Sequence, residues 1–131
     1  FILRPGTDIT LVSWGAMMVE TMAAAGQLAE QGVQCEVVDV ASISPLDNQT
    51  IVNSVMKTGR CIIIHEAART CGVGAEIAAT VAEQAYPYLK APVSRITGYD
   101  TIMPYFKNEN YYLPKVERIV EVALEANGYG L

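Results

Sequence analysis

The residue of this chain that is best suited to acid–base or ligand chemistry is His65, the only histidine in the sequence. It ends an apolar run at 61–64 and is followed by Glu66. A neighbouring carboxylate would favour the protonated imidazole and fix one tautomer. A single histidine excludes a two-histidine metal site. We therefore predict either a hydrogen-bonded histidine that braces the following loop or a contact with a ligand or a partner.

The predicted loop at 66–74 ends in Gly-Val-Gly and leads into a helix. Glycines at the start of a helix let backbone N–H groups hold an anion, and Arg69 adds a positive charge. The sequence is not a dinucleotide-binding fingerprint, because Ile77 stands at the third glycine position. It is not a phosphate-binding P-loop either, because no Gly-Lys-Ser or Gly-Lys-Thr occurs. Both a tight strand-to-helix connection and an anion site stay open.

The three cysteines give no recognisable active site. Cys71 is placed on the exposed loop near a helix start, where its thiol pKa could fall, but it has no second cysteine two residues away. Cys35 and Cys61 are predicted to be core residues of strands. An odd number of cysteines in a chain of this size favours a reducing, intracellular compartment. No spacing of carboxylates indicates an acid–base pair or a metal site, so the residues supply no complete catalytic set.

The elements that must position these residues alternate between apolar strands and alanine-rich helices. We predict strands at 8–14, 35–40, 60–65 and 93–97, helices at 16–31, 47–59, 75–86 and 115–126, and a long irregular segment at 98–114. Strands that are apolar throughout are covered on both faces, and the strand–helix–strand order makes them parallel. The prediction is one α/β domain with three layers, helix over sheet over helix.

In such sheets, ligands and partners collect beyond the carboxyl ends of the strands. This edge is predicted to carry Trp14, His65, Glu66, Arg69 and Asp100. We take it as the candidate edge for a ligand or a partner.

Composition indicates a folded domain with more apolar material than its own core requires. The chain has 131 residues, of which 51% are hydrophobic and 18% charged, with a net charge of −5. The acidic balance argues against nucleic acid or anionic membrane as a partner. No apolar run approaches the roughly 20 residues of a membrane helix, and the first residues do not resemble a signal peptide. The apolar surplus predicts a surface that covers another subunit.

Two predicted helices, at 16–31 and 75–86, carry only two charges each. A helix that is apolar nearly all round is buried on more than one side. We predict a subunit interface on these helices; the alternative is crowding by loops of the same domain. The predicted interface residues are Met17, Met18, Met22, Ala25, Ile77 and Val81. A separate aromatic group, Tyr105, Phe106, Tyr111 and Tyr112, is expected to pack the long loop down, although such residues also anchor interfaces.

Several short motifs occur in a fixed order along the chain. They are TDITLVSWG at 7–15, VVDV at 37–40, SPLD at 44–47, IIIHEA at 62–67, GVGAEI at 72–77, APVSRITGYD at 91–100 and YLP at 112–114. In this order they resemble the carboxyl-terminal, transketolase-type domain of the β subunit of a 2-oxo acid dehydrogenase decarboxylating component, of the pyruvate or branched-chain kind. The resemblance covers essentially the whole chain.

The resemblance implies a five-stranded, mostly parallel sheet whose first strand, at 2–4, runs antiparallel. It also implies that this chain is part of a longer β subunit, in a parent of two α and two β subunits in the bacterial cytoplasm or mitochondrial matrix. That parent uses thiamine diphosphate and magnesium to decarboxylate a 2-oxo acid and to acylate a lipoyl group. The chain lacks the Gly-Asp-Gly and distant Asn that hold the magnesium diphosphate, so we expect no catalytic residue and no bound cofactor or metal in this domain.

In this family the domain packs subunits together and helps to dock the peripheral subunit-binding domain of the dihydrolipoyl acyltransferase core. Lys90 stands where many relatives carry an acidic residue for that docking, and Ala68 and Cys71 replace a common Pro and Gly. Two alternatives stay open. One is a free-standing regulatory module that binds a small anion; the other is the same domain of an acetoin-cleaving relative.

Overall fold

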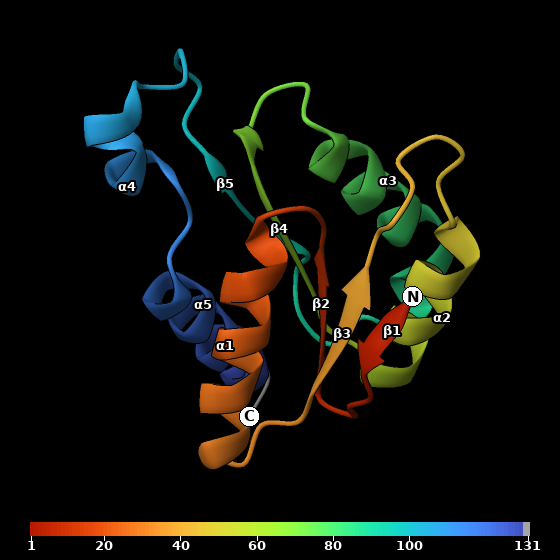
Figure 1. Cartoon of the computed structure of the whole chain (residues 1–131). Helices are drawn as coiled ribbons and strands as arrows, with labels where there is room; N and C mark the ends of the chain where they lie inside the picture. Colours follow the sequence, from red (N-terminus) through yellow and green to blue (C-terminus); the bar gives the residue numbers. More distant parts are fainter. Residues whose placement is uncertain (130–131) are drawn as a thin grey trace.

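The computed structural model describes residues 1–129, which fold into one sheet flanked by helices (Figure 1). The strands are β1 (Ile2–Arg4), β2 (Ile9–Ser13), β3 (Cys35–Asp39), β4 (Cys61–Ala68) and β5 (Ser94–Gly98). The helices are α1 (Met17–Glu30), α2 (Asn48–Thr58), α3 (Val73–Ala85), α4 (Glu109–Tyr112) and α5 (Val116–Gly128), with short 3-10 turns η1 (Tyr86–Tyr88) and η2 (Phe106–Asn108). None of these helices is long and apolar enough to cross a membrane.

The strands form a single sheet in the order β1-β3-β2-β4-β5. The pairs β2–β3, β2–β4 and β4–β5 are parallel, whereas β1 runs antiparallel to β3. Leu11 of β2 lies between Val37 of β3 and Ile62 of β4. The predicted five-stranded, mostly parallel sheet with an antiparallel first strand is confirmed.

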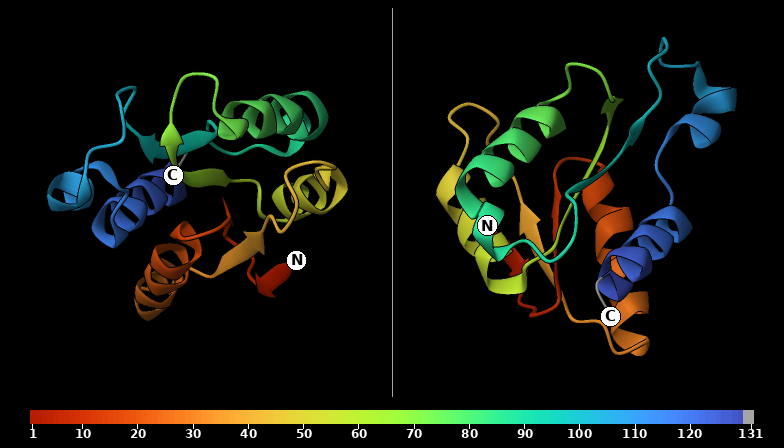
Figure 2. Two further views of the ribbon diagram at one scale, coloured as in Figure 1. Left: turned by 45° about the horizontal axis from the view of Figure 1, so that its top comes forward. Right: turned by 180° about the vertical axis from the view of Figure 1, so that it is seen from behind.

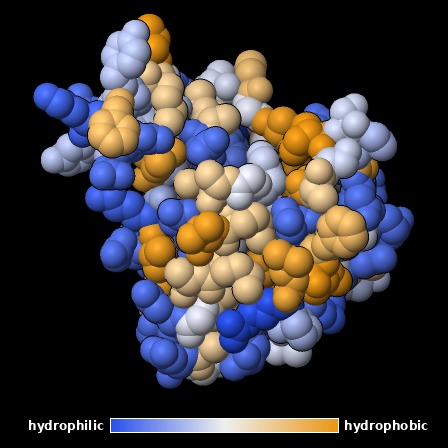
Figure 3. Space-filling view, in the orientation of Figure 1, coloured by the Kyte–Doolittle hydropathy of each residue, from blue (hydrophilic) through white to orange (hydrophobic). Residues whose placement is uncertain are grey.

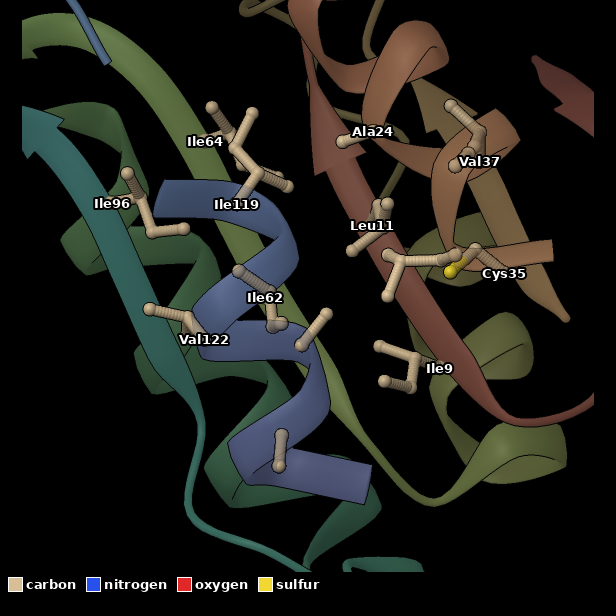
Figure 4. Close-up of a cluster of buried hydrophobic side chains, with 14 of the residues drawn as sticks. Ile9, Leu11, Ala24, Cys35, Val37, Ile62, Ile64, Ile96, Ile119 and Val122 are labelled. Atoms are coloured by element: carbon tan, nitrogen blue, oxygen red, sulfur yellow. The ribbon is translucent and has the colours of Figure 1, made fainter. Parts of the chain in front are cut away.

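Helices cover both faces of the sheet, as predicted, with α1 and α5 on one side and α2 and α3 on the other (Figures 1 and 2). The three consecutive isoleucines of β4 show how a sheet that is covered on both faces uses an unbroken apolar run. Ile62 and Ile64 pack in the core beneath α1 and α5, which Figure 4 shows, while Ile63 points to the opposite core. Successive side chains of a strand alternate between faces, so both faces must be apolar here.

Local chemistry fixes where the helices begin and end. Asp47 caps α2, because its carboxylate accepts the backbone N–H of Thr50 at 3.0 Å. Gly59 ends that helix in the left-handed region at φ 78°, and Gly32 follows α1 at φ 82°. Both glycines stand where the sequence predicted the helices to stop.

The loop after β4 is shorter than predicted. The strand was expected to end at His65, but β4 continues to Ala68, which pairs with Gly98 of β5 after an irregularity in the register. Pairing with β5 therefore extends β4 beyond the apolar run that marks this strand in the sequence. Helix α3 also begins two residues early, at Val73, and the segment at 98–114 contains η2 and α4.

A buried polar cluster lies near the amino ends of the parallel strands, beneath α2. Glu36 is 1% exposed and forms an ion pair with Lys57, and it also accepts the backbone N–H of Gly6 at 3.3 Å. Burial by itself would raise the pKa of Glu36, but hydrogen bonds from Lys57, Ser54 and Gly6 outweigh it and lower the pKa. The Ser54 hydroxyl is in turn 2.8 Å from that of Thr10. We call these residues the Glu36 cluster; each of its polar groups has a partner.

Candidate functional site

The carboxyl edge of the sheet brings Trp14 and His65 together. Their rings stack with centroids 5.2 Å apart at an interplanar angle of 21°. The His65 side chain, 1% exposed, also lies against the Gly-Val-Gly sequence that begins α3. A Cβ at Gly74 would lie 2.5 Å from Nε2 of His65, and one at Gly72 would lie 2.9 Å from Cε1. These glycines therefore make room for the ring, which explains the sequence without a bound phosphate.

The hydrogen bond that we predicted for the His65 side chain is not formed. Both ring nitrogens are buried and have no hydrogen-bond partner among the described residues. Burial lowers the pKa of His65; the nearby backbone of Ala67 opposes this shift, and the positive charges of Arg95 and Arg69 add to it. The side chain of Glu66 is exposed and forms no ion pair with the ring. His65 therefore packs against the Trp14 ring and the glycines that begin α3 without a hydrogen bond from its ring nitrogens.

Two arginines lie side by side next to this ring. Nη1 of Arg69 donates to the backbone oxygen of Arg95 at 2.9 Å, and Nη1 of Arg95 donates to the backbone oxygen of Arg69 at 3.1 Å. Within residues 1–129 neither guanidinium has a carboxylate within ion-pair distance. Sequence reasoning named Arg69 and missed Arg95. The position of Arg95 depends on the adjacent strand, because parallel pairing puts it beside Ile63, two residues before His65.

Asp100 fastens the end of β5 to the loop after β4. Its carboxylate accepts the backbone N–H of Thr70 at 2.8 Å and the Thr70 hydroxyl at 2.5 Å. These hydrogen bonds, first that of the side chain and then that of the backbone, lower the pKa of Asp100. Asp100 therefore reaches the predicted edge, where it holds the loop in place.

The thiols have the environments that the sequence predicted. All three cysteines are free; Cys35 and Cys61 are buried and Cys71 is exposed. Burial raises the pKa of Cys35 to about 11 and that of Cys61 to about 12, so both are protonated core residues. Cys71 has a φ of 59°, a left-handed conformation that glycine adopts more easily.

The predicted subunit interface contains four residues that the structure buries inside this domain. Met17, Ala25, Ile77 and Val81 are at most 1% exposed and belong to the two cores. Their assignment to a subunit surface is wrong, because a helix that is apolar all round does not reveal in its sequence which side faces its own sheet. Met18 and Met22 are partly buried at the margin of the core.

The outer face of the first half of α1 is apolar nevertheless, whereas Gln27 and Glu30 are exposed in its second half. Val19 is 73% exposed, and Ala16 and Ala23, one helical turn away on either side, are exposed as well. Figure 3 shows this apolar surface on the face of the molecule that α1 occupies. The predicted interface residues did not include Val19, because helical spacing places it between the buried positions.

The long segment after β5 carries a second apolar surface. Tyr105 is 96% exposed and Phe106 is 88% exposed, and Ile102 and Met103 are exposed beside them. We call these four residues the apolar tip. Of the four aromatic residues expected to pack the loop down, Tyr112 does so, since it is buried and its hydroxyl donates to the Tyr99 carbonyl at 3.2 Å. Tyr105, Phe106 and Tyr111 instead face outward.

The remaining candidate, Lys90, lies at the other end of the sheet. Its backbone N–H donates to the Gly59 carbonyl at 2.8 Å, and its aliphatic stem covers Gly59, where a Cβ would lie 2.8 Å from Cδ. The backbone and the aliphatic stem of Lys90 are therefore held in place next to Gly59.

Comparisons with known proteins agree with the fold. The family described as "Transketolase, C-terminal domain" matches residues 1–119. The chain is 44% identical over 122 residues to the pyruvate dehydrogenase E1 component subunit beta of Staphylococcus epidermidis, covering 93% of this chain and 38% of that protein. It is also 44% identical over 128 residues to the subunit of the same name from Leifsonia xyli subsp. xyli, covering 98% of this chain and 38% of that protein.

Among solved structures, a protein described as "Split gene transketolase, inactive beta4 tetramer" superposes with a TM-score of 0.85 at 27% identity. The match covers all of this chain and 42% of that one. The chain thus spans less than half the length of these relatives. From the match over residues 1–119 and the superposition at a TM-score of 0.85, this chain belongs to the transketolase C-terminal domain family.

Proposed function

We propose that this chain is the carboxyl-terminal domain of the β subunit of a 2-oxo acid dehydrogenase decarboxylating component, and that it assembles subunits without performing chemistry itself. One observation carries the proposal. A chain 44% identical to pyruvate dehydrogenase β subunits exposes apolar side chains on α1 and on the apolar tip. Exposed apolar side chains that gather in this way mark a surface for a partner.

The outer face of α1 is suited to close contact between subunits. Its inner side is fixed by residues such as Met17 and Leu28, which are buried against the sheet. Ala16 and Ala23 flank Val19 with small side chains, so another backbone can approach closely. The α subunit and the second β subunit of the parent are the partners we assign to this surface and to the apolar tip.

The parent's reaction is the oxidative decarboxylation of pyruvate or a branched-chain 2-oxo acid, with transfer of the acyl group to a lipoyl group. Thiamine diphosphate and magnesium supply that chemistry in the parent. Residues 1–129 contain no group of three His, Cys, Asp or Glu side chains placed to hold a metal ion. The magnesium diphosphate therefore does not fit the residues of this domain, and we assign it no step of the reaction. In the parent enzyme, the acyltransferase docks through its peripheral subunit-binding domain. We assign this docking to the surface around Lys90.

The experiment compares two matched substitutions in the full-length β polypeptide co-expressed with its α subunit. Val19→Arg puts a charge on the outer face of α1, and Asn53→Arg puts the same charge on the exposed, polar side of α2. We expect light scattering to show dissociation of the heterotetramer for Val19→Arg alone, with unchanged circular dichroism. Equal assembly of both variants would contradict the proposal, as would decarboxylation of a 2-oxo acid by this domain alone with thiamine diphosphate and magnesium.

A further inference from the structure

The outer edge of β5 borders a groove that is lined by several arginine and tyrosine side chains. The proposed role in subunit assembly does not account for this lining. The groove has a volume of about 940 Å³ and lies between β5, the start of the segment after it, and the exposed side of α5. It is lined by Arg69, Arg95, Thr97, Tyr99, Tyr111 and Lys115, among others. It is distinct from the outer face of α1 and from the apolar tip.

The first observation concerns the backbone of β5. This strand pairs with β4 on one side only and ends the sheet. The back view of Figure 2 looks onto this edge, with α3 on one side of it and α4 and α5 on the other. An unpaired edge presents alternate N–H and C=O groups that only an extended chain can satisfy as a ladder.

The second observation is the charge of the groove. Four of the nine Lys and Arg residues of this acidic chain line it, against three of its fourteen Asp and Glu residues. Glu121 and Arg118 pair with each other at 2.6 Å, and Asp100 is bonded to Thr70. Three cations, Arg69, Arg95 and Lys115, are then left against one carboxylate, that of Glu117. Arg69 and Arg95 have no carboxylate partner within residues 1–129. The groove thus complements an acidic occupant.

The third observation is the side chains at its rim. Tyr99 and Tyr111, both mostly exposed, flank the carboxyl end of β5. Side chains of an added strand would point alternately to the two faces of the sheet. Acidic residues at alternate positions would then reach the arginines, and apolar ones would lie against the tyrosine rings.

We propose that β5 accepts an extended, acidic segment of another polypeptide as a sixth strand, with its carboxylates bound by Arg69 and Arg95. A second copy of this chain fits less well. Antiparallel pairing of two β5 strands about a two-fold axis would bring both arginine pairs together, and like charges on neighbouring strands repel. The sixth-strand site and the assembly surface involve different residues, so each can fail without the other.

The test uses the full-length polypeptide that carries this domain and two fluorescent peptides of strand length. One alternates Glu and Val, and the other alternates Lys and Val. Titrations are followed by anisotropy, and hydrogen exchange reports on the amides of β5. We expect the Glu peptide to bind at least about tenfold more tightly than the Lys peptide, because its carboxylates meet two arginine forks. Binding should weaken with salt and should slow exchange within Ser94–Gly98.

Matched variants locate the site. Arg95→Gln is expected to weaken the Glu peptide about tenfold, while Lys107→Gln, which removes an exposed charge outside the groove, should change it by less than about twofold. The peptide comparison and the exchange data use the unaltered protein, so they decide the question even if a variant misfolds.

Three results would overturn the proposal. The two peptides could bind equally. The Glu peptide could bind without slowing exchange in β5 and be displaced by inorganic phosphate at constant ionic strength, which would identify a small-anion site. Alternatively, β5 could become protected with rising protein concentration in the absence of peptide, which would identify pairing between two copies.

Discussion

Glu36 is buried near the amino ends of the parallel strands and His65 near their carboxyl ends, and the two side chains differ in their hydrogen-bond partners. At the amino end, Glu36 is surrounded by an ammonium group, a backbone N–H and a hydroxyl network. At the carboxyl end, both nitrogens of His65 lack a hydrogen-bond partner among the described residues, and the adjacent Arg69 and Arg95 have no carboxylate. A buried polar network that is fully paired rigidifies a core, whereas an unpaired buried polar group costs stability. The polar groups of the amino end are therefore paired within the fold, whereas His65, Arg69 and Arg95 at the carboxyl edge have no acidic partner among the described residues.

The sharpest test of this contrast is a methyl group added at Gly6. Its Cβ would lie 2.2 Å from the backbone carbon of Cys35, which cannot move without distorting β3. We expect Gly6→Ala to destabilise the domain by more than about 3 kcal/mol, measured by urea unfolding. Gly26→Ala is the control, since a Cβ there meets no atom within 4 Å. A loss for Gly6→Ala as small as that of the control would show that the amino end is not rigid.

Removing the paired carboxylate should have the next largest effect. Glu36→Ala leaves the Gly6 N–H without its acceptor, and we expect a loss of about 2 kcal/mol of unfolding free energy. Lys57, whose side chain is 48% exposed, can return to water, so the loss stays below that of a fully buried pair. The control, Glu121→Ala, breaks an exposed pair and should change stability by less than about 0.5 kcal/mol. Equal losses for both variants would contradict the structural role of the cluster.

A methyl group added at Gly74, at the carboxyl edge, would contact a side chain, whereas one added at Gly6 would contact backbone. A Cβ at Gly74 would lie 2.5 Å from Nε2 of His65, and the ring can shift. We expect Gly74→Ala to lower stability by about 1 to 2 kcal/mol, less than Gly6→Ala does. In a His65→Ala background the loss should shrink by about 1 kcal/mol, because the clashing ring is gone. Strict additivity in this double-mutant cycle would rule out His65 as the brace of the loop.

The smallest expected effect is on the pH dependence of stability, to which His65 and Glu36 contribute in different pH ranges. The folded-state pKa of His65 lies below its ordinary value of 6.5, so protons bind to the unfolded chain first as the pH falls below that value. His65 should therefore lower stability as the pH drops from about 7.5 to about 5.5, and His65→Phe should flatten this slope. The pKa of Glu36 is also lowered, from 4.5, so its contribution is complete above that pH and is lost only at lower pH. Glu36→Gln should leave the slope above pH 5.5 unchanged; a flattened slope in that variant would contradict the assignment.

Most of the architecture could be predicted from the sequence, because strand and helix periods are local properties. Three consecutive isoleucines in β4 require two covered faces, and glycines at 32 and 59 end the helices they follow. The extension of β4 to Ala68 could not be predicted, because it depends on pairing with Gly98, thirty residues away in the chain. The resemblance to transketolase-type domains supplied the antiparallel β1, whose three residues carry too little pattern of their own.

The candidate site was predictable in outline only. Parallel strands end at one edge of the sheet, so the sequence alone placed Trp14, His65 and Asp100 at that edge. Whether a group there is paired depends on neighbours from other elements, and the tertiary structure left His65 unbonded and tied Asp100 to Thr70.

The sequence by itself determined the layers and the parallel direction of β2, β3, β4 and β5, because both follow from residue type and local spacing. The tertiary structure decided which side of α1 faces the sheet, burying Met17 and exposing Val19. It also put Arg95 beside Arg69 through strand pairing, and it left the edge of β5 open. These features arise where separate elements meet, so their physical cause is long-range packing.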